Sequence, residues 1–239
     1  RAGRAAGVPG PRPLLSEQDP RELAEPFLMM ERIAGRQERS TSLGGRERAV
    51  ARDMGRVLAA MHRIDPATCG RPAELALEPR ARVLARIDQF QTLWNENQTV
   101  PSVIAESGYA WARANVDRLD DTTVLVHGDF DLRNVLIDGD HLSAVLDWER
   151  SHVGHPAEDL AYCRRDMEDM GVWDLFLESY RAHGGHAVTE PMLEFFRVWG
   201  NLFRNASGSR AHNGYVTGLH TDFLMGSAGF IELPRIQRQ

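Results

Sequence analysis

The chain has 239 residues, of which 42% are hydrophobic and 26% are charged, and this composition predicts a soluble globular protein. Its formal net charge of −6 leaves no excess positive field to hold a phosphate backbone, which excludes nucleic acid as a main partner. No apolar stretch approaches the roughly 18 residues needed to cross a bilayer, so we expect a cytoplasmic protein without a membrane partner.

The first half of the chain shows one short strand and three helices. Residues 1–34 are short segments broken by prolines, and the last of these, 27–33, is predicted to be a buried strand that ends in a turn. Apolar residues at helical spacing then predict a helix over 45–64 and a second around 83–94. A third, less regular helix is predicted from 101 to about 119.

The hydrophobic period changes near residue 123. The segment "TVLVHGDFDLRNVLIDGDHLSAVLDW" is rich in β-branched residues, and its Asp138-Gly139 pair is a strong signal for a hairpin turn. Helices are predicted to return at about 172–183 and 190–206, the second with Thr189 as its N-cap and a wide apolar stripe. The pattern predicts an α+β fold in which a hairpin interrupts a mostly helical chain.

The predicted hairpin brings two oxygen-bearing side chains together. A two-residue turn after Asp138 would set Asn134 opposite Val145, and Asp147 would be the diagonal neighbour of Asn134, roughly 7–8 Å away at the backbone. An amide oxygen and a carboxylate are hard donors, and without a partnering histidine or thiolate they favour magnesium. A three-residue turn would instead place the two side chains on opposite faces.

The same register divides the hairpin into two faces. Leu136 would lie on the metal face. The other face is predicted to anchor the hairpin in the core. Its apolar residues are Val135, Ile137, Leu142, Ala144 and Leu146.

Asp129 precedes Asn134 by five residues, on a loop that would enter the strand from the metal side. A carboxylate beside a magnesium ion can accept the proton of a hydroxyl that attacks a phosphoryl group, and such a base contributes roughly 10²- to 10⁴-fold in rate. Taken singly, Asp129, Asn134 and Asp147 also fit simpler interpretations, as a turn cap, a strand start and a strand end. Their combination at these intervals favours a catalytic site.

These motifs resemble a known family. "HGDFDLRNVLI" and the later "AVLDWERSHVGHPAEDLAY" are similar to the catalytic segment of the aminoglycoside phosphotransferase and choline kinase-like family, relatives of protein kinases. "LVHGDF", "AVLDWE", "GHP" and "DLAY" resemble most the branch found alone or fused to acyl-CoA dehydrogenases. The resemblance covers nearly the whole chain. It implies a protein-kinase-like fold, with 1–34 as part of an N-terminal β lobe and hinge and 35–239 as a helical C-terminal lobe.

The resemblance also implies a role for each motif residue. Asp129 would be the catalytic base, and Asn134 and Asp147 would bind Mg²⁺. His127 and Asp159 would hold the catalytic loop by hydrogen bonds. The adenine of the co-substrate ATP would lie against the backbones of Glu31 and Ile33 and the side chains of Met30 and Leu136.

A kinase of this type also needs a Gly-rich loop and a strand lysine that binds the nucleotide phosphates. The chain contains no lysine: all 28 of its Lys and Arg residues are arginine. Two explanations stay open, an N-terminally truncated phosphotransferase and a catalytically inactive, kinase-like protein that binds a nucleotide or metabolite. Because the base and both metal ligands are intact, we favour truncation, and we expect 1–239 alone to transfer little or no phosphoryl group.

The acceptor is expected to be a hydroxyl group of a small molecule, because the predicted helical lobe offers no basic track and no extended peptide edge. The branch resemblance favours a hydroxylated metabolite, a class that includes hydroxyacyl thioesters. An aminoglycoside would need an acidic cleft. The acidic residues of "RRDMEDMGVWD" and "LESY", after Tyr162, keep that alternative open.

Overall fold

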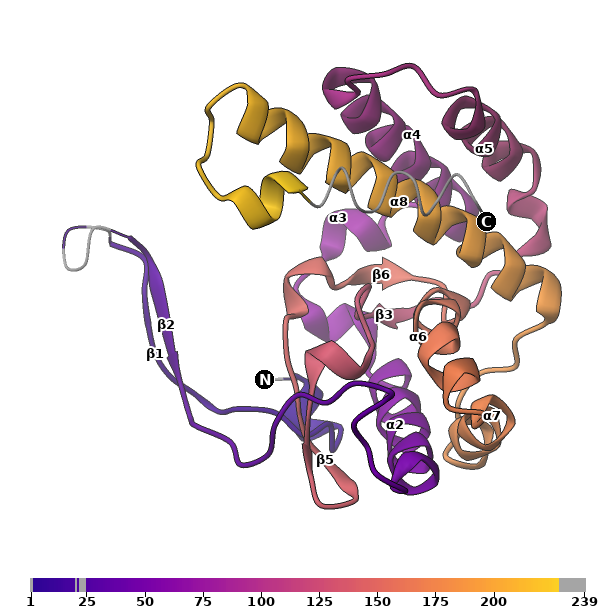
Figure 1. Cartoon of the computed structure of the whole chain (residues 1–239). Helices are drawn as coiled ribbons and strands as arrows, with labels where there is room; N and C mark the ends of the chain where they lie inside the picture. Colours follow the sequence, from indigo (N-terminus) through magenta and orange to yellow (C-terminus); the bar gives the residue numbers. More distant parts are fainter. Residues whose placement is uncertain (1, 20, 22–24, 228–239) are drawn as a thin grey trace. The chain divides into compact units, whose positions relative to one another are not determined.

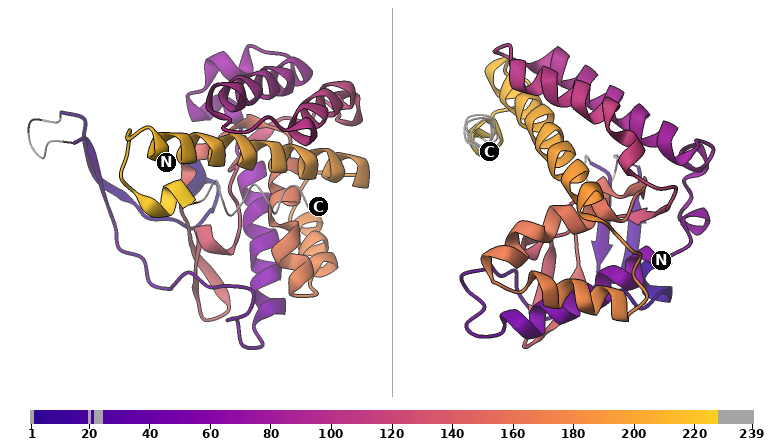
Figure 2. Two further views of the ribbon diagram at one scale, coloured as in Figure 1. Left: turned by 45° about the horizontal axis from the view of Figure 1, so that its top comes forward. Right: turned by 90° about the vertical axis from the view of Figure 1, so that its right-hand side faces the viewer.

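A computed structural model describes residues 2–19, 21 and 25–227 (Figures 1 and 2). The chain forms two compact units. Unit 1 is Arg1–Pro72 together with Val124–Ala187, and unit 2 is Ala73–Thr123 together with Val188–Gln239. All residues that the sequence singles out for the active site lie in unit 1. The functional division into 1–34 and 35–239 stays a prediction.

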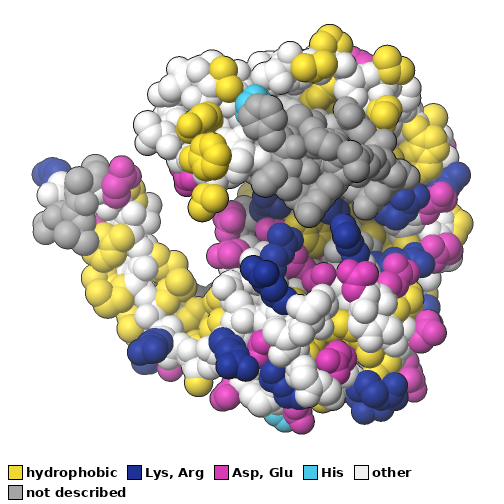
Figure 3. All heavy atoms as spheres, viewed as in Figure 1, with side chains coloured by type: hydrophobic (Ala, Val, Ile, Leu, Met, Phe, Trp, Pro, Cys, Tyr) yellow, Lys and Arg dark blue, Asp and Glu magenta, His cyan; other side chains and the backbone are white. Residues whose placement is uncertain are grey.

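The first strands of unit 1, β1 (Pro13–Glu17) and β2 (Phe27–Met30), form an antiparallel hairpin. The strand predicted at 27–33 is present, but it ends at Met30 and is exposed, so the expectation that it is buried was wrong. A two-stranded sheet by itself has no second layer to cover its apolar faces. Figure 3 shows hydrophobic side chains gathered along this hairpin. Those about half exposed are Leu14, Leu15, Leu28, Met29 and Met30.

The predicted second hairpin is formed by β4 (Val135–Asp138) and β5 (His141–Val145). Its two-residue turn pairs Asp138 with His141, as expected, and Gly139 in the turn adopts a φ of +60°. A separate two-stranded sheet joins β3 (Val124–Val126) to β6 (His152–Gly154). Strand β3 leads into the predicted catalytic segment, β4 and β5 lie within it, and β6 follows Asp147.

The register of the β4–β5 hairpin departs from the prediction beyond the turn. Val145 pairs with Val135 and not with Asn134, because Ser143 is an extra residue in a β-bulge. Val145 is consequently buried, and Leu146, which was predicted to be buried, is half-buried. The other four residues of the predicted core face are buried as expected.

A distant segment explains the bulge. The backbone of Ile137 exchanges two hydrogen bonds with Arg36, at 2.9 and 3.0 Å, so its N–H and C=O point away from β5. The Ser143 hydroxyl donates to the backbone oxygen of Ala34 at 2.5 Å. Gly35 lies between these contacts, where a Cβ would come within 2.6 Å of the Ser143 hydroxyl. The segment around Arg36 thus pairs with β4 and sets the register.

Three helices complete unit 1: α2 (Glu47–His62), α6 (Ala157–Asp169) and α7 (Trp173–Ala182). Helices α2 and α7 confirm predictions, and the apolar face of α2 is fully buried. They cross closely at Gly55, where an added Cβ would lie 2.5 Å from the backbone oxygen of Phe176. Helix α6 was not predicted, although its buried positions recur at steps of three and four: Ala157, Leu160, Cys163 and Met167.

Unit 2 is helical. Helices α4 (Pro79–Asn97) and α5 (Val103–Ala114) pack against the long helix α8 (Glu190–Val216), as Figures 1 and 2 show. All three confirm predicted helices, and α8 extends ten residues beyond its predicted end. Phe90 of α4 contacts two aromatic rings of α8. No helix in the described ranges is long and apolar enough to cross a membrane.

Short elements connect these helices and strands. The α-helical ones are α1 (Ala2–Ala5) and α3 (Pro72–Leu75). The 3-10 turns are η1 (Pro66–Cys69), η2 (Val116–Arg118), η3 (Leu132–Asn134) and η4 (Trp148–Arg150). Two of these turns, η3 and η4, lie in the predicted catalytic segment, and each includes or directly follows a predicted metal ligand.

Candidate active site

The loop that carries Asp129 begins at the end of β3 and leads through η3 into β4. Its path depends on Gly128, which has a φ of +80°. A Cβ at this position would lie 2.8 Å from the backbone oxygen of Arg150. Glycine is required on both counts, because other residues rarely adopt this conformation and because a side chain would not fit. Asp129 therefore leaves the loop in a fixed direction.

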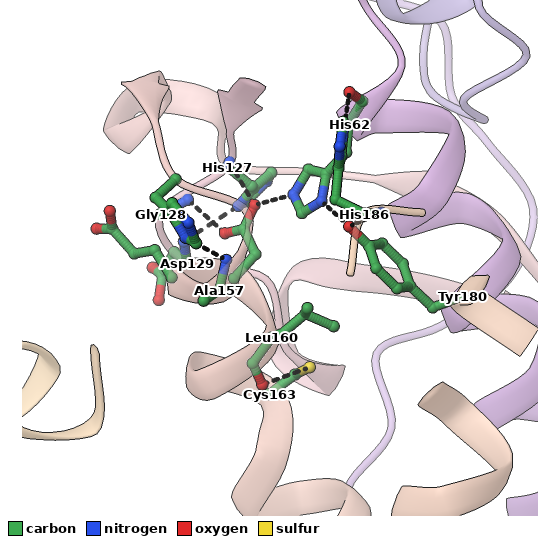
Figure 4. A network of polar contacts seen from close by, with 12 residues as sticks. His62, His127, Gly128, Asp129, Ala157, Leu160, Cys163, Tyr180 and His186 are labelled. Carbon is green, nitrogen blue, oxygen red and sulfur yellow. Dashed lines mark hydrogen bonds and ion pairs between the residues drawn. The ribbon is translucent and has the colours of Figure 1, made fainter. Parts of the chain in front are cut away.

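Asp159, on α6, binds the backbone of this loop at His127 and Gly128, which Figure 4 labels. Its two carboxylate oxygens accept the backbone N–H groups of His127 and Gly128, each at 2.8 Å. Burial of the carboxyl group raises its pKa, but the hydrogen bond from His62 and the other favourable contacts outweigh this effect and lower the pKa overall. An ionised carboxylate thus binds the two N–H groups directly before Asp129.

His127 links the loop to the segment that carries Asp147. Its Nε2 lies 2.7 Å from the backbone oxygen of Leu146, and its Nδ1 accepts the N–H of Asp129 at 3.3 Å. The ring also contacts Trp148, with centroids 4.9 Å apart. A neutral ring that donates from Nε2 and accepts at Nδ1 satisfies both contacts. Buried His127 therefore connects the Asp129 loop to the segment that carries Asp147.

Asn134 is buried at the end of η3. Its side-chain nitrogen donates to the backbone oxygen of Asp129 at 2.8 Å, and its own backbone oxygen accepts the N–H of Leu146, also at 2.8 Å. With the amide nitrogen held by the loop, the amide oxygen is the atom left to bind a cation. Asn134 thus lies beside the residue that precedes Asp147.

The backbone of Asp147 is not that of a β-strand. It follows β5 and has a left-handed backbone, with φ 56° and ψ 57°. The predicted diagonal pairing with Asn134 was therefore wrong in detail, because the bulge changes the register and Asp147 lies outside the strand. The hydrogen bond between Leu146 and Asn134 restores the proximity at the backbone. The Asp147 side chain is exposed and thus accessible to an ion.

The Asp129 side chain is 16% exposed and lies next to a cation that the sequence did not single out. Arg150, in η4, places its Nη1 3.5 Å from an Asp129 carboxylate oxygen. Arg150 is three residues after Asp147 and 21 after Asp129, so only the η4 turn reveals this proximity. The pair gives the site an anion beside a guanidinium, a combination suited to binding a proton and a phosphate oxygen.

A second pair that the sequence did not single out, Asp131 and Arg133, lies within the loop itself. Buried Asp131 caps η3 by accepting the backbone N–H of Arg133 at 2.8 Å, and it also binds the Arg133 guanidinium. This hydrogen bond raises the pKa of Arg133. The spacing of a carboxylate two residues before an arginine is a signal for such a turn, and it was available in "DLR".

The four residues expected near adenine fall in two places of unit 1. Met30 and Glu31 are exposed at the end of β2, Ile33 is half-buried after it, and Leu136 is half-buried in β4. The N–H of Glu31 donates to the backbone oxygen of Arg12 at 2.9 Å, which leaves its carbonyl as the group available to a ligand. Their contact with adenine stays a prediction.

The donor set near Asp129 fits magnesium. Asn134 and Asp147 offer an amide oxygen and a carboxylate, and Mg²⁺ in nucleotide sites commonly takes one or two protein oxygens together with phosphate and water. Within the described ranges, no group of three or more His, Cys, Asp and Glu side chains is arranged to hold a metal by itself.

Comparison with known proteins identifies the relatives of this chain. Residues 1–198 match the Phosphotransferase enzyme family. The chain belongs to this family. The chicken (Gallus gallus) protein named acyl-CoA dehydrogenase family member 11 is 31% identical over 253 residues, which cover 94% of this chain and 31% of that protein. Mouse (Mus musculus) acyl-CoA dehydrogenase family member 10 is 33% identical over 168 residues, which cover 66% and 15%.

Solved structures share the fold. A Ralstonia eutropha JMP134 protein assigned to the aminoglycoside phosphotransferases has a TM-score of 0.79 at 22% identity, with 98% of this chain and 78% of that chain covered. A choline/ethanolamine kinase family protein from Mesorhizobium loti has a TM-score of 0.70 at 17% identity, with 100% and 76% covered. The predicted α+β, protein-kinase-like fold is confirmed, as is the relationship to the branch with acyl-CoA dehydrogenases.

The matched region is a small part of each curated relative. The chain spans 31% of the length of the chicken relative and 15% of the mouse relative. The match over residues 1–198 assigns the chain to a family of phosphotransferases.

Proposed function

We propose that this protein transfers the γ-phosphoryl group of ATP to a hydroxyl group of a small molecule, with Asp129 as the catalytic base. The observation that carries the proposal is the fixed loop around Asp129. The backbone N–H of Asp129 donates to the His127 ring, and its backbone oxygen accepts the side-chain N–H of Asn134. The two N–H groups that precede Asp129 donate to the Asp159 carboxylate. Such preorganisation is what phosphoryl transfer requires, since positioning and electrostatics supply most of its rate.

The reaction needs one proton acceptor. The acceptor hydroxyl forms a bond to the γ-phosphorus, the bond from that phosphorus to the β–γ bridging oxygen breaks, and the hydroxyl proton moves to the Asp129 carboxylate. ADP and a phosphate monoester are the products. Arg150, whose Nη1 is 3.5 Å from Asp129, would place positive charge beside the carboxylate and the transferred group.

Magnesium would be held by the amide oxygen of Asn134 and the carboxylate of Asp147, and when bound it supplies neutralisation of the charge on the phosphates. His127 supports both ligands, because it binds the backbone of Leu146 next to Asp147 and the loop that ends in Asn134. Met30, Glu31, Ile33 and Leu136 are the residues proposed to contact adenine.

The proposed acceptor is a hydroxylated metabolite, and a hydroxyacyl thioester is the class that the relatives favour. The support is the similarity to two proteins named as acyl-CoA dehydrogenase family members. Hydroxyl-bearing antibiotics are the second class, because the structural neighbours include a macrolide 2′-phosphotransferase from Brachybacterium faecium. We propose a cytoplasmic protein, in keeping with a nucleotide co-substrate.

The absence of lysine motivates a second candidate function, a nucleotide- or metabolite-binding protein without turnover. Residues 1–239 supply no ammonium group to hold the phosphates of ATP. We therefore expect these residues alone to bind Mg²⁺-ATP weakly and to transfer little phosphoryl group.

Calorimetric titration with ATP, with and without Mg²⁺, tests the binding half of the proposal. We expect binding that requires Mg²⁺ and that Asp147→Ala abolishes. Asp140→Ala is the matched control, because Asp140 is another exposed carboxylate at the tip of the same hairpin. Equal binding by the two variants would show that Asp147 is not a metal ligand.

Turnover separates the two candidate functions. The full-length natural protein is incubated with Mg²⁺-ATP and a panel of hydroxyl compounds that contains hydroxyacyl thioesters and macrolides, and phosphate esters are detected by mass spectrometry. We expect a product that Asp129→Asn eliminates. Magnesium-dependent binding without any product would favour the inactive binding protein.

A further inference from the structure

Behind the catalytic loop, a buried chain of polar groups continues from Asp159 into α2 and α7. His62 Nε2 lies 3.1 Å from an Asp159 carboxylate oxygen, and His62 Nδ1 lies 2.8 Å from the Tyr180 hydroxyl (Figure 4). The Tyr180 and His62 rings meet edge to face, with centroids 5.6 Å apart. His62 is 2% exposed and Tyr180 and Asp159 are fully buried, so the chain is isolated from solvent.

The proton positions along this chain follow from its end. Asp159 already accepts two backbone N–H groups, and an ionised carboxylate can only accept, so His62 Nε2 must carry a hydrogen. A neutral His62 then presents a lone pair at Nδ1, which the Tyr180 hydroxyl fills by donating to it. The Tyr180 oxygen in turn accepts the backbone N–H of His186 at 3.1 Å. Burial raises the pKa of Tyr180, which keeps its hydroxyl hydrogen in place.

We propose that Tyr180 is a positioning residue for the catalytic base: its hydroxyl donates to His62 Nδ1 and holds the ring with Nε2 toward Asp159, and Asp159 then holds the backbone before Asp129. The consequence for turnover rests on the proposed function, whereas the consequence for the loop does not. Without the Tyr180 donor, Nδ1 has lost this partner and the side-chain contact to Asp159 at Nε2 has to hold the ring without it. A less firmly held ring would weaken the hold of Asp159 on the loop.

Two other contacts make α7 suited to this role. Helices α2 and α7 cross at Gly55, where an added Cβ would lie 2.9 Å from the backbone nitrogen of Tyr180. His186, after α7, places its Nε2 3.4 Å from the backbone oxygen of His62. The tyrosine and its histidine partner are therefore held at a set separation by the backbone of both elements.

Nuclear magnetic resonance of the wild-type chain gives the first test, because the ¹⁵N shifts of a histidine ring distinguish a protonated nitrogen from an unprotonated one. We expect His62 to be protonated at Nε2 and unprotonated at Nδ1. A hydrogen on Nδ1 in the wild type would overturn the proposal without any variant.

The variant Tyr180→Phe removes the hydroxyl and keeps the ring. We expect it to change the His62 ring shifts and to accelerate hydrogen exchange at the Gly128 amide roughly 3- to 10-fold, the factor that one hydrogen bond is worth. Tyr109→Phe is the matched control. Tyr109 is fully buried in unit 2, and its hydroxyl donates to the backbone oxygen of Phe90 at 3.1 Å. Each variant therefore removes the hydroxyl of a buried tyrosine, with the loss of one hydrogen bond at Tyr109 and of two at Tyr180.

The control separates positioning from stability. Tyr109→Phe should lower the free energy of unfolding but leave the His62 ring shifts and the Gly128 exchange rate as in the wild type. If Tyr180→Phe also leaves both unchanged, the positioning role is wrong. In the full-length natural protein, Tyr180→Phe should lower kcat roughly 3- to 10-fold at unchanged KM for ATP. Absence of turnover in the wild type would contradict the proposed function alone, since the two spectroscopic tests are independent of it.

Discussion

Asn134 and Asp129 hold each other in place: the Asn134 side-chain nitrogen donates to the Asp129 backbone oxygen across 2.8 Å. The bond ties the proposed metal ligand to the proposed base, and it leaves the amide oxygen of Asn134 as the atom that could bind an ion. A change at either residue should therefore affect both the geometry of the base and the binding of the metal.

The first prediction concerns Asn134→Ala. This variant leaves the Asp129 carbonyl without its donor and removes one oxygen ligand, so we expect a loss of about 1–2 kcal/mol in the free energy of unfolding and a loss of magnesium-dependent ATP binding. Asn115→Ala is the control, because the Asn115 side-chain nitrogen also donates to a backbone oxygen, that of Trp111, at 2.8 Å. Urea unfolding and calorimetry measure both effects. Equal magnesium-dependent binding by the two variants would argue against a metal ligand at Asn134.

The second prediction concerns Gly128→Ala. Alanine at a φ of +80° costs about 1–2 kcal/mol, and here the Cβ would also meet the backbone oxygen of Arg150 at 2.8 Å. Gly7→Ala isolates the first effect, because Gly7 has the same φ of +80° and nothing within 4 Å of an added Cβ. Urea unfolding should show the larger loss for Gly128→Ala, and that variant alone should weaken Mg²⁺-ATP binding. Equal losses of unfolding free energy in the two variants would mean that the close contact between residue 128 and Arg150 adds no cost.

The third prediction compares the stability effects of alanine at two helical glycines. Gly55→Ala should destabilise the protein by roughly 1–3 kcal/mol, because its Cβ would lie 2.5 Å from the backbone of Phe176 and force α2 and α7 apart. Gly200→Ala in α8 should instead stabilise unit 2 by about 0.5–1 kcal/mol, because the nearest atom to its Cβ, at 3.3 Å, is the flexible end of Arg204. Thermal unfolding measures both. Stabilisation by Gly55→Ala would contradict the close crossing.

The fourth prediction concerns the pH dependence of stability at Glu38, whose partner Arg46 contacts the turn of the β4–β5 hairpin. The Ser42 hydroxyl and the guanidinium groups of Arg36 and Arg46 lower the pKa of Glu38 from 4.5 to about 2. Arg46 also donates to the backbone oxygen of Gly139, in the turn of the hairpin, at 2.7 Å. Because the folded-state pKa is the lower one, the stabilisation is complete above about pH 4.5 and is lost as the pH falls toward 2.

Urea unfolding between about pH 2 and pH 7 tests this dependence. The difference in unfolding free energy between the wild type and Glu38→Gln should be constant near neutral pH and should shrink below about pH 4.5. Parallel curves over the whole range would show that Glu38 titrates normally in the folded state.

Much of the site could be predicted because its signals are local. "HGDFDLRN" places the proposed base and an amide five residues apart, and the turn at Gly139 pairs Asp138 with His141 as expected. The periodic face of α2 also follows from its spacing alone. In these cases the residues that determine the structure are a few positions apart, so propensity and periodicity are sufficient.

Other features depend on segments that meet only in the folded chain. Ser143 is in a bulge because the Arg36 segment occupies the hydrogen-bonding groups of Ile137, about 100 residues away in sequence. Arg150 reaches Asp129 through the η4 turn, and the polar character of α6 concealed the helix on which Asp159 lies. No local pattern contains these contacts.

The sequence by itself determined the β4–β5 hairpin with its two-residue turn, and it singled out the residues proposed as base and oxygen donors, because each rests on a short-range pattern. The tertiary structure alone decided how these groups are held. His62, Asp159 and Tyr180 come from three helices and meet in one buried chain of hydrogen bonds behind the loop. A buried polar group must find a partner wherever the fold brings one near, and that partner is set by helix packing rather than by distance along the chain.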